Sequence, residues 1–368
     1  MVQISLALPE DFRFGEVTAI PRVTGLAPVA PPLGPLATFT GAWIGSGFNT
    51  IFRPLSGGGP DNILELNLTS EQLTFSADLG SVPNRGFVQP DIFFNGVPYL
   101  QAISDVTSGP AVGIHVEPGI WIAVPSTTNP REVATFTRMA SIPHGVTIEA
   151  QGTSTTHPGA PNIPAVSITP TAQGHSFVFP SQTAATASQF RIPHDLTTFI
   201  AAGTITQAIL NDPNTVLRNH IHNQNIVSTD IISINTQPVA PITGGGTSNI
   251  AFLTGGAPGN QPNARAVQMS ATFWIETVEE IIIVPPFKPG EPPLTIEGAS
   301  EGSGRIAPKF IVRPPIEIVQ PRRITIQFKQ IQYSQNVILV FNGLNWPHVS
   351  VATLTSANGT VVTPVGGW

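Results

Sequence analysis

The sequence predicts an all-β protein made of two antiparallel barrels in tandem. Its 368 residues include 34 Gly and 38 Pro, with 10% charged and 41% hydrophobic residues. This is too apolar for a disordered chain and too often interrupted for a helical bundle. Segments that alternate apolar and polar residues recur along the chain, as half-buried strands do. Closure into barrels is expected because an open sheet this apolar would expose adhesive edges.

Composition also narrows the partners. The net charge of −6 is spread without long runs, so no basic surface for nucleic acid is expected. The chain has no cysteine, which excludes disulfides, thiolate metal sites, iron–sulfur clusters and cysteine nucleophiles. The N-terminus lacks the basic region of a signal peptide, and no apolar run reaches membrane-spanning length. We therefore expect a soluble, cytoplasmic monomer.

Three short segments, which we call anchors, each occur twice and in the same order along the chain. They indicate an internal duplication. The run from Asn49 to Arg53 matches the run from Asn214 to Arg218, and both read Asn-Thr-x-x-Arg. Two further pairs follow in the same order: the Trp121 and Trp274 strands, and the Pro-His sequences at 143–144 and 347–348. Three anchors in one order predict a repeated domain.

The domain boundaries follow from composition. Residues 1–35 are expected to be a proline-rich arm, and 36–152 the first barrel, which opens with the Phe39–Phe48 strand. Residues 153–198, rich in Pro, Ser, Thr and Ala, read as a linker with one short helix at 181–189. The second barrel then takes 199–368, beginning with a strand at 203–207, and carries a proline-rich insertion at about 285–321 that cannot be regular sheet throughout.

Four segments carry a resemblance to a known family. Gly41-Ala-Trp-Ile-Gly-Ser-Gly47 resembles the Gly-x-Trp-x-Gly-x-Gly opening strand of nitrobindin-like proteins, the haem-binding branch of the calycin barrels related to lipocalins and fatty-acid-binding proteins. Pro347-His348-Val-Ser-Val351 is similar to the last strands of that family, whose His is the axial ligand of the haem iron. Pro143-His144 is a looser version, and Gly119 to Ile122 resembles the mid-barrel Trp strand. The segment at 203–207 departs from the opening motif because it lacks the Trp and two of the glycines.

The resemblance implies calycin-like barrels and a haem b site with His348, and in the first barrel His144, as metal ligands. Such a site needs a neutral imidazole, apolar walls and partners for two propionates. The candidates that could supply these are His348, Trp346, Trp274, Phe341 and Arg218 in the second barrel, and His144, Trp121, Trp43, Met139 and Arg53 in the first. The plainer alternatives are a Pro-His corner bonded to a carbonyl, tryptophans that fill the core, and arginines bonded to backbone carbonyls at a barrel rim.

Two further histidine patterns could carry other chemistry. His115-Val-Glu117 places an imidazole and a carboxylate on one strand face, which could do acid and base work in an apolar pocket. His220-Ile-His222 has the spacing of a metal site if it lies on a strand. An ordinary polar pair and a hydrogen-bonded barrel interior are the alternatives.

The leading functional prediction is a protein that binds a planar hydrophobic small molecule, most specifically haem b through His348. The resemblance then implies ferric chemistry with peroxide, nitric oxide or peroxynitrite. The second alternative is a cofactor-free cyclase or isomerase for a hydrophobic substrate, with His115 and Glu117 as acid and base and Arg53 as anchor. The third is a structural or partner-binding module whose barrels are filled with side chains. Whether the chain is an enzyme is left open.

Overall fold

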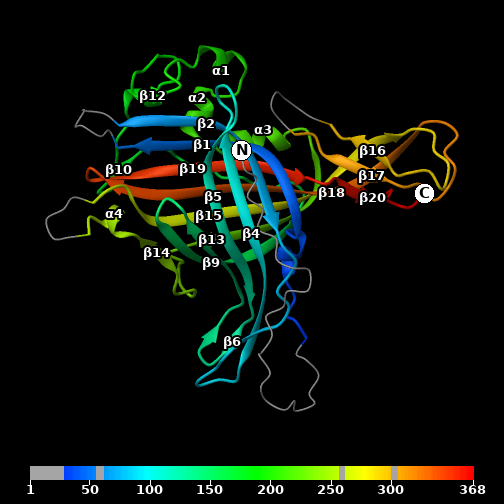
Figure 1. Cartoon of the computed structure of the whole chain (residues 1–368), viewed down its shortest axis with the longest axis horizontal. Coiled ribbons are helices and arrows are strands. Elements are labelled where there is room, and N and C mark those ends of the chain that lie inside the picture. Colours follow the sequence, from blue (N-terminus) through cyan, green and yellow to red (C-terminus); the bar gives the residue numbers. More distant parts are fainter. Residues whose placement is uncertain (1–28, 55–61, 257–261, 300–305) are drawn as a thin grey trace.

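Ten long antiparallel strands close one barrel in the computed structural model, which describes residues 29–54, 62–256, 262–299 and 306–368 (Figure 1). Most of the expected proline-rich arm, residues 1–28, lies outside the described residues. In order around the barrel the strands are β1 (Gly41–Arg53), β2 (Ile63–Phe75), β4 (Ile92–Asp105), β5 (Val112–Val124), β8 (Thr135–Ile142), β9 (Val146–Pro158), β13 (Asn225–Asn235), β15 (Arg265–Val284), β18 (Arg322–Phe341) and β19 (Leu344–Ser356).

Both halves of the chain contribute to this barrel, so the expectation of two tandem barrels is not confirmed. β9 of the first half pairs with β13 of the second along most of its length. β1 pairs with β19 from Trp43 opposite Ser356 to Thr50 opposite Val349, which closes the sheet. Neither half closes on itself, and the all-β class is confirmed.

The glycines of the opening strand lie at this closing seam. A Cβ atom on Gly45 would lie 2.1 Å from the carbonyl oxygen of Thr353, and one on Gly47 would lie 2.0 Å from that of Val351. Glycine therefore permits the close approach of β1 to β19. The neighbour that this opening strand approaches is the backbone of β19.

Inward-facing side chains fill the barrel at one end. The turn of 3-10 helix η1 (Gly34–Thr38) covers this end, where Leu36 and Phe39 are buried against Trp43 and Trp121. The Trp43 indole donates a hydrogen bond to the Phe39 carbonyl, at 2.8 Å. Interior side chains of β2, β4, β13, β15 and β19 complete this core. The tryptophans here are core fillers, as the plainer interpretation held.

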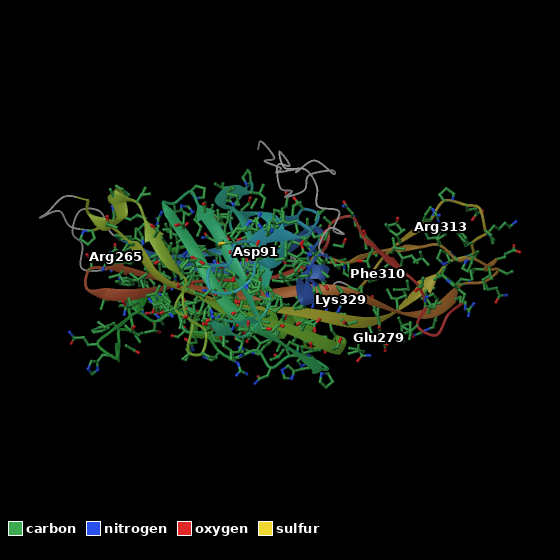
Figure 2. All side chains as sticks on the ribbon, turned by 90° about the horizontal axis from the view of Figure 1, so that it is seen from below. Asp91, Arg265, Glu279, Phe310, Arg313 and Lys329 are labelled. Atoms are coloured by element: carbon green, nitrogen blue, oxygen red, sulfur yellow. The ribbon has the colours of Figure 1, made fainter. Side chains whose placement is uncertain are left out.

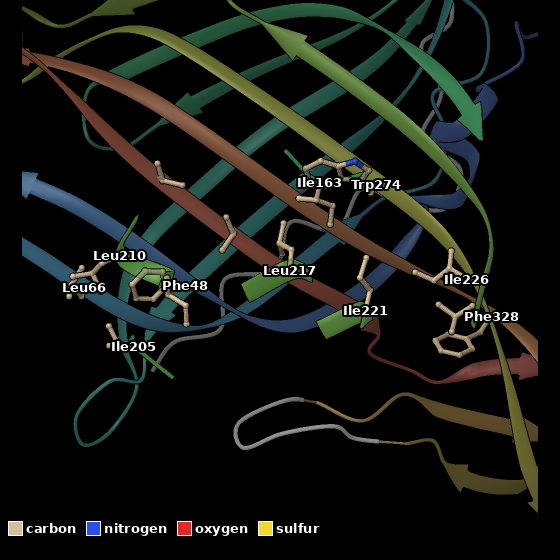
Figure 3. Packing of buried hydrophobic residues seen from close by; sticks show 14 of the residues in the cluster. Phe48, Leu66, Ile163, Ile205, Leu210, Leu217, Ile221, Ile226, Trp274 and Phe328 are labelled. Carbon is tan, nitrogen blue, oxygen red and sulfur yellow. The ribbon is translucent and has the colours of Figure 1, made fainter. Parts of the chain in front are cut away.

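The segment between β9 and β13 lies on the outer wall of the barrel. It contains η2 (Pro180–Gln182), α1 (Thr197–Ala201), α2 (Gln207–Asn211) and α3 (Thr215–Ile221). Figure 3 shows side chains of these helices, among them Leu210 and Leu217, in one apolar cluster with Phe48 and Leu66, which point outward from β1 and β2. Of the helix expected at 181–189, only the 3-10 turn η2 at its start forms, and the strand expected at 203–207 is a turn that leads into α2.

A buried arginine holds this segment together. The Arg191 guanidinium donates hydrogen bonds to the carbonyl oxygens of five residues, Ser181, Thr183, Thr186, Pro193 and His194. β12 (Arg191–Ile192) adds a short parallel pair to β2. A buried cation is tolerated here because its donors are satisfied by carbonyl dipoles.

The repeated anchors do not occupy equivalent places. Arg53 ends strand β1, whereas Arg218 lies in helix α3, where its guanidinium bonds Asp212 and the Ile163 carbonyl. Trp121 packs inside the barrel and Trp274 packs in the outer cluster. The shared letters therefore do not reflect a shared fold, because the Asp212 side chain, which bonds the Asn214 amide and Arg218, favours a helix in the second segment.

The proline-rich insertion joins the far ends of the two longest strands. β15 and β18 stay paired as far as Val284 opposite Arg322, well beyond the neighbouring strands. The insertion carries β16 (Leu294–Glu297) and β17 (Lys309–Val312), which form a small sheet with β20 (Thr360–Val362). Figures 1 and 2 show this sheet, with Phe310 and Arg313, projecting to one side of the barrel.

The remaining described elements are short. They are β3 (Val82–Asn84), β6 (Thr127–Thr128), β7 (Arg131–Glu132), β10 (Thr171–Ala172), β11 (His175–Ser176), β14 (Gly246–Asn249) and α4 (Ala251–Thr254). Among the residues described, no helix has the length and apolar character needed to cross a membrane.

Candidate functional site

A cavity of about 400 Å³ lies in the barrel, at the end opposite η1. Its walls are mostly aliphatic, with one methionine, and its floor carries neutral amides and hydroxyls. The apolar lining is Ile51, Ile103, Ile114, Ile142, Val146, Ile148, Leu253, Ala264, Ala266, Met269, Val337 and Leu339; the polar lining is Asn49, Arg53, Glu65, Asn67, Gln101, His115, His144, Tyr333, Gln335, His348 and Ser350. This size and this mixture of surfaces are typical of a small-molecule pocket.

Three of the predicted histidines meet in this cavity. His348 comes from β19, His115 from β5, and His144 from the turn between β8 and β9. The rings of His115 and His144 lie 5.6 Å apart, centre to centre. The sequence placed His144 and His348 in separate barrels; the single closed barrel brings them to one site.

His348 lies within a strand rather than at a corner. β1 pairs with β19 only as far as Val349, so Pro347 lies beyond the last rung on that side, where a proline is tolerated. The His348 Nε2 atom lies 2.8 Å from Nδ2 of Asn49, which also donates to Ser350 Oγ at 2.7 Å. Burial, together with the His115 and His144 rings, lowers the pKa of His348 to about 3. The ring is therefore neutral at physiological pH.

A tight turn and a backbone hydrogen bond orient the His144 ring. The turn needs Gly145, whose φ is +97° and whose Cβ would lie 2.7 Å from the Ile250 side chain beside α4. The Ile114 backbone carbonyl accepts a hydrogen bond from the His144 ring, while burial and the His115 ring lower the pKa of His144. A neutral imidazole whose second nitrogen donates to a carbonyl is the usual arrangement of a metal-ligating histidine.

A buried ion pair lies next to His115. The Nε2 atom of His115 is 3.3 Å from Glu117 Oε2. Glu117 in turn forms a salt bridge with Arg138, whose side chain is 2% exposed. Arg138 Nε also donates to Tyr99 Oη at 2.7 Å, and Tyr99 bonds Glu117. Although burial opposes ionisation, Arg138 and His115 hold the pKa of Glu117 at about 2. Glu117 therefore stays ionised and orients His115.

Burial raises the pKa of a second buried carboxyl, that of Glu71, to near neutral pH. Tyr333, which lines the cavity, donates to Glu71 Oε2 at 2.6 Å and accepts from Gln101 Nε2 at 3.0 Å. Burial raises the pKa of Glu71 from 4.5 to about 7, against the opposing hydrogen bonds from Tyr333, Thr69 and Gln101 and the charge of His115. The bond between Glu71 and Tyr333 was not predicted from the sequence, where only the alternation of β2 indicates that Glu71 points inward.

Replacing Glu71 by glutamine should flatten the pH dependence of stability. Because the folded pKa lies above the unfolded value, the native state binds more protons between pH 4.5 and 7, and stability falls as pH rises through this window. The loss attributable to Glu71 is at most about 3 kcal/mol. Urea unfolding of the parent and Glu71→Gln at pH 4.5, 6 and 8 measures it. Parallel curves for the two proteins would contradict the assignment.

The other predicted site residues do not all reach the cavity. Arg53 stands at its mouth with 46% of its side chain exposed, and its Nε atom pairs with Glu65 at 3.0 Å. Trp43 and Trp121 belong to the core at the other end. The remaining predicted residues lie outside the barrel interior: Trp274, Trp346 and Phe341 in the outer apolar cluster, Met139 on the outer face of β8, and Arg218 on α3.

Metal binding by side chains alone has little support. His220 and His222 lie in and just after helix α3, so they do not share a strand face as expected. Within the described residues, no group of three or more His, Cys, Asp or Glu side chains is arranged to hold a metal ion. A metal at the cavity histidines would need ligands from a cofactor.

Comparisons with known proteins add little to this description of the site. No family model and no curated protein matches the chain, so membership of the nitrobindin-like family stays a prediction. Among solved structures, "Crystal Structure of Rv2717c from M. tuberculosis" aligns with a TM-score of 0.32 and 11% identity, over 89% of this chain and 98% of that chain. A likeness at this level supports no statement about function.

Proposed function

We propose that the protein binds a hydrophobic small molecule in the barrel cavity. The observation that carries the proposal is the cavity itself, about 400 Å³ in volume, with aliphatic walls and three imidazoles at one end of the barrel. A barrel that served only as a scaffold would be expected to fill this space with side chains. The cavity therefore favours ligand binding over the structural alternative.

The specific proposal is haem b with His348 as its axial ligand. The residues fit this group in two respects: His348 and His144 are neutral, and the walls are apolar. Arg53 at the mouth would pair with a haem propionate by exchanging Glu65 for it. Ligation through His348 Nε2 would replace its contact with Asn49, whose amide keeps its hydrogen bond to Ser350. Haem, when bound, would supply ferric chemistry with peroxide, nitric oxide or peroxynitrite.

The cofactor-free enzyme remains a second proposal because His115 lines the cavity beside a carboxylate. In that reaction Glu117 would be the base and His115 the acid. A carboxylate whose pKa is about 2 is a weak base at neutral pH, and Glu117 is already paired with Arg138. The anchor proposed at Arg53 would have to exchange Glu65 for substrate, as it would for a haem propionate. The weak base makes this proposal the weaker one.

Absorption spectra during haemin titration test the haem proposal. We expect a Soret band that saturates at one equivalent, is lost in His348→Ala, and persists in His157→Ala, whose exposed ring on β9 serves as the matched control. Loss only in His144→Ala would move the axial ligand to His144. A spectrum of free haemin throughout would overturn haem binding.

A second measurement keeps the broader proposal testable. The fluorescent probe 1-anilinonaphthalene-8-sulfonate should bind the parent protein and bind less to a Val337→Trp variant, in which an indole fills the cavity. Equal fluorescence of the two proteins would overturn cavity binding.

A further inference from the structure

A second, separate groove crosses the outer wall of the barrel. It has a volume of about 440 Å³ and runs over β9, β13, β15 and β18. Its rim is formed by residues 164–166 of the segment after β9, together with Asn214, and by Pro238, Val239 and Ile242 of the loop after β13. The groove faces outward, so it shares no side chain with the histidine cavity.

The floor of the groove is two parallel rows of neutral hydrogen-bonding side chains. The strand register aligns Thr153, Ser233, Thr272 and Ser334 across four neighbouring strands in the first row. It aligns Gln151, Asn235, Ser270 and Asn336 in the second row. Within the first row, the Ser233 and Thr272 hydroxyls lie 3.3 Å apart. Neighbouring members of a row stand about 4.8 Å apart, the spacing of strands in a sheet.

Two acceptors in the groove are buried without a donor. The Oδ1 atoms of Asn214 and Asn336 accept no hydrogen bond from the described residues, and Asn214 is only 3% exposed. The Asn214 amide nitrogen is committed to the Pro164 carbonyl, at 2.7 Å, so the orientation of this side chain is fixed. A buried acceptor left unpaired costs free energy, which a ligand hydroxyl or amide N–H would recover.

The chemistry of the lining excludes several ligands. None of the described residues that line the groove is Asp, Glu, Lys, Arg or His, so phosphates and charged peptides would find no counter-charge there. β13, β15 and β18 are paired on both sides, so an extended peptide cannot add to them as a strand. A lipid chain would cover two rows of polar groups without bonding them. Trp274 underlies one end of the groove but is only 1% exposed, so it offers no aromatic face on which a planar ligand could stack.

We propose that this groove binds a neutral oligosaccharide. Such a chain is extended and uncharged, and it presents hydroxyl groups that both donate and accept at intervals comparable to the spacing between the strands. Four strands would accommodate a chain of about four sugar rings along a row. The free acceptors of Asn214 and Asn336 would take ligand hydroxyl protons, and the row hydroxyls would complete the contact.

Calorimetric titration with neutral hexasaccharides tests the proposal. The probes are cellohexaose, xylohexaose, mannohexaose, laminarihexaose, maltohexaose and N-acetylchitohexaose. At least one should bind, with an affinity that is unchanged between low and high salt because no charge takes part. Absence of binding to all six at millimolar concentration would overturn the proposal, and so would a steep fall in affinity with salt.

Two variants locate the binding in the groove. Thr272→Val removes one hydroxyl and keeps the shape, so affinity should fall about tenfold, the effect of one lost hydrogen bond. Asn336→Leu removes the unpaired acceptor and should lower affinity by about tenfold or more without lowering the melting temperature, because that amide oxygen has no partner to lose. Thr295→Val, on the exposed side of β16, is the matched control and should bind normally.

The two sites are distinguished by the remaining variants. Full affinity in both Thr272→Val and Asn336→Leu would show that the sugar binds elsewhere and would overturn the proposal. His348→Ala should leave sugar binding unchanged, since that residue belongs to the interior cavity. The success or failure of haem binding therefore does not decide this inference.

Discussion

Replacing Arg138 by methionine is expected to lower the free energy of unfolding by about 3–5 kcal/mol, the usual cost of breaking a buried ion pair from one side. The substitution leaves the Glu117 carboxylate buried and removes the donors to Tyr99 and Gln335. Urea unfolding at pH 7 measures the effect. Arg85→Met is the matched control, because Arg85 pairs with Asp91 at the surface with 64% of its side chain exposed, where a pair contributes at most about 1 kcal/mol.

The double variant Arg138→Met with Glu117→Gln completes the experiment. Removing both charges should restore much of the stability, because the cost lies in the unpaired carboxylate more than in the lost attraction. The ion pair also sets an acid limit: the folded pKa of Glu117 lies below its unfolded value, so its contribution is present above pH 4.5 and is lost as pH falls toward 2. A cost for Arg138→Met no larger than that for Arg85→Met would refute this account.

Alanine at Gly47 is expected to open the closing seam of the barrel. The new Cβ would lie 2.0 Å from the Val351 carbonyl oxygen and 2.8 Å from the Ala352 Cβ, so β1 and β19 would have to separate. Overpacking of this kind costs about 1–3 kcal/mol or more. Gly113→Ala on β5 is the matched control, since nothing lies within 4 Å of its added Cβ.

Hydrogen exchange shows where the damage falls. In Gly47→Ala the amides of β1 and β19 should exchange faster, while those between β4 and β5 keep their protection. Uniformly faster exchange, or a melting temperature equal to that of Gly113→Ala, would indicate that the seam does not depend on glycine.

The strand pattern was predictable, whereas the closure was not. Alternation indicated strands such as β2, whose inward face is buried from Asn67 to Phe75. The number of barrels depends on which strands pair across long distances, and local patterns carry no such information. The short repeats misled for the same reason: Asn-Thr-x-x-Arg ends a strand at Arg53 and forms a helix at Arg218.

The candidate site was predicted in part. His144 and His348 were named because both follow proline in a motif that resembles a haem-ligand strand, and His115 because it shares a strand face with Glu117. The structure brings the three together. Trp274 and Trp346 were expected beside the ligand but point outward, because an aromatic residue suits either face of a sheet. Arg138 and Glu71 were missed, since their importance comes from partners on other strands.

Closure by the first and last long strands has a consequence for how the protein is made. Asn49 and Ser350 bond across the seam although they are 301 positions apart in the chain. During synthesis β1 therefore emerges long before its partner exists, and one edge of the growing sheet stays unpaired meanwhile. Contacts so distant in sequence make folding slow. The nascent chain is thus expected to depend on chaperones that shield this open edge until β19 arrives.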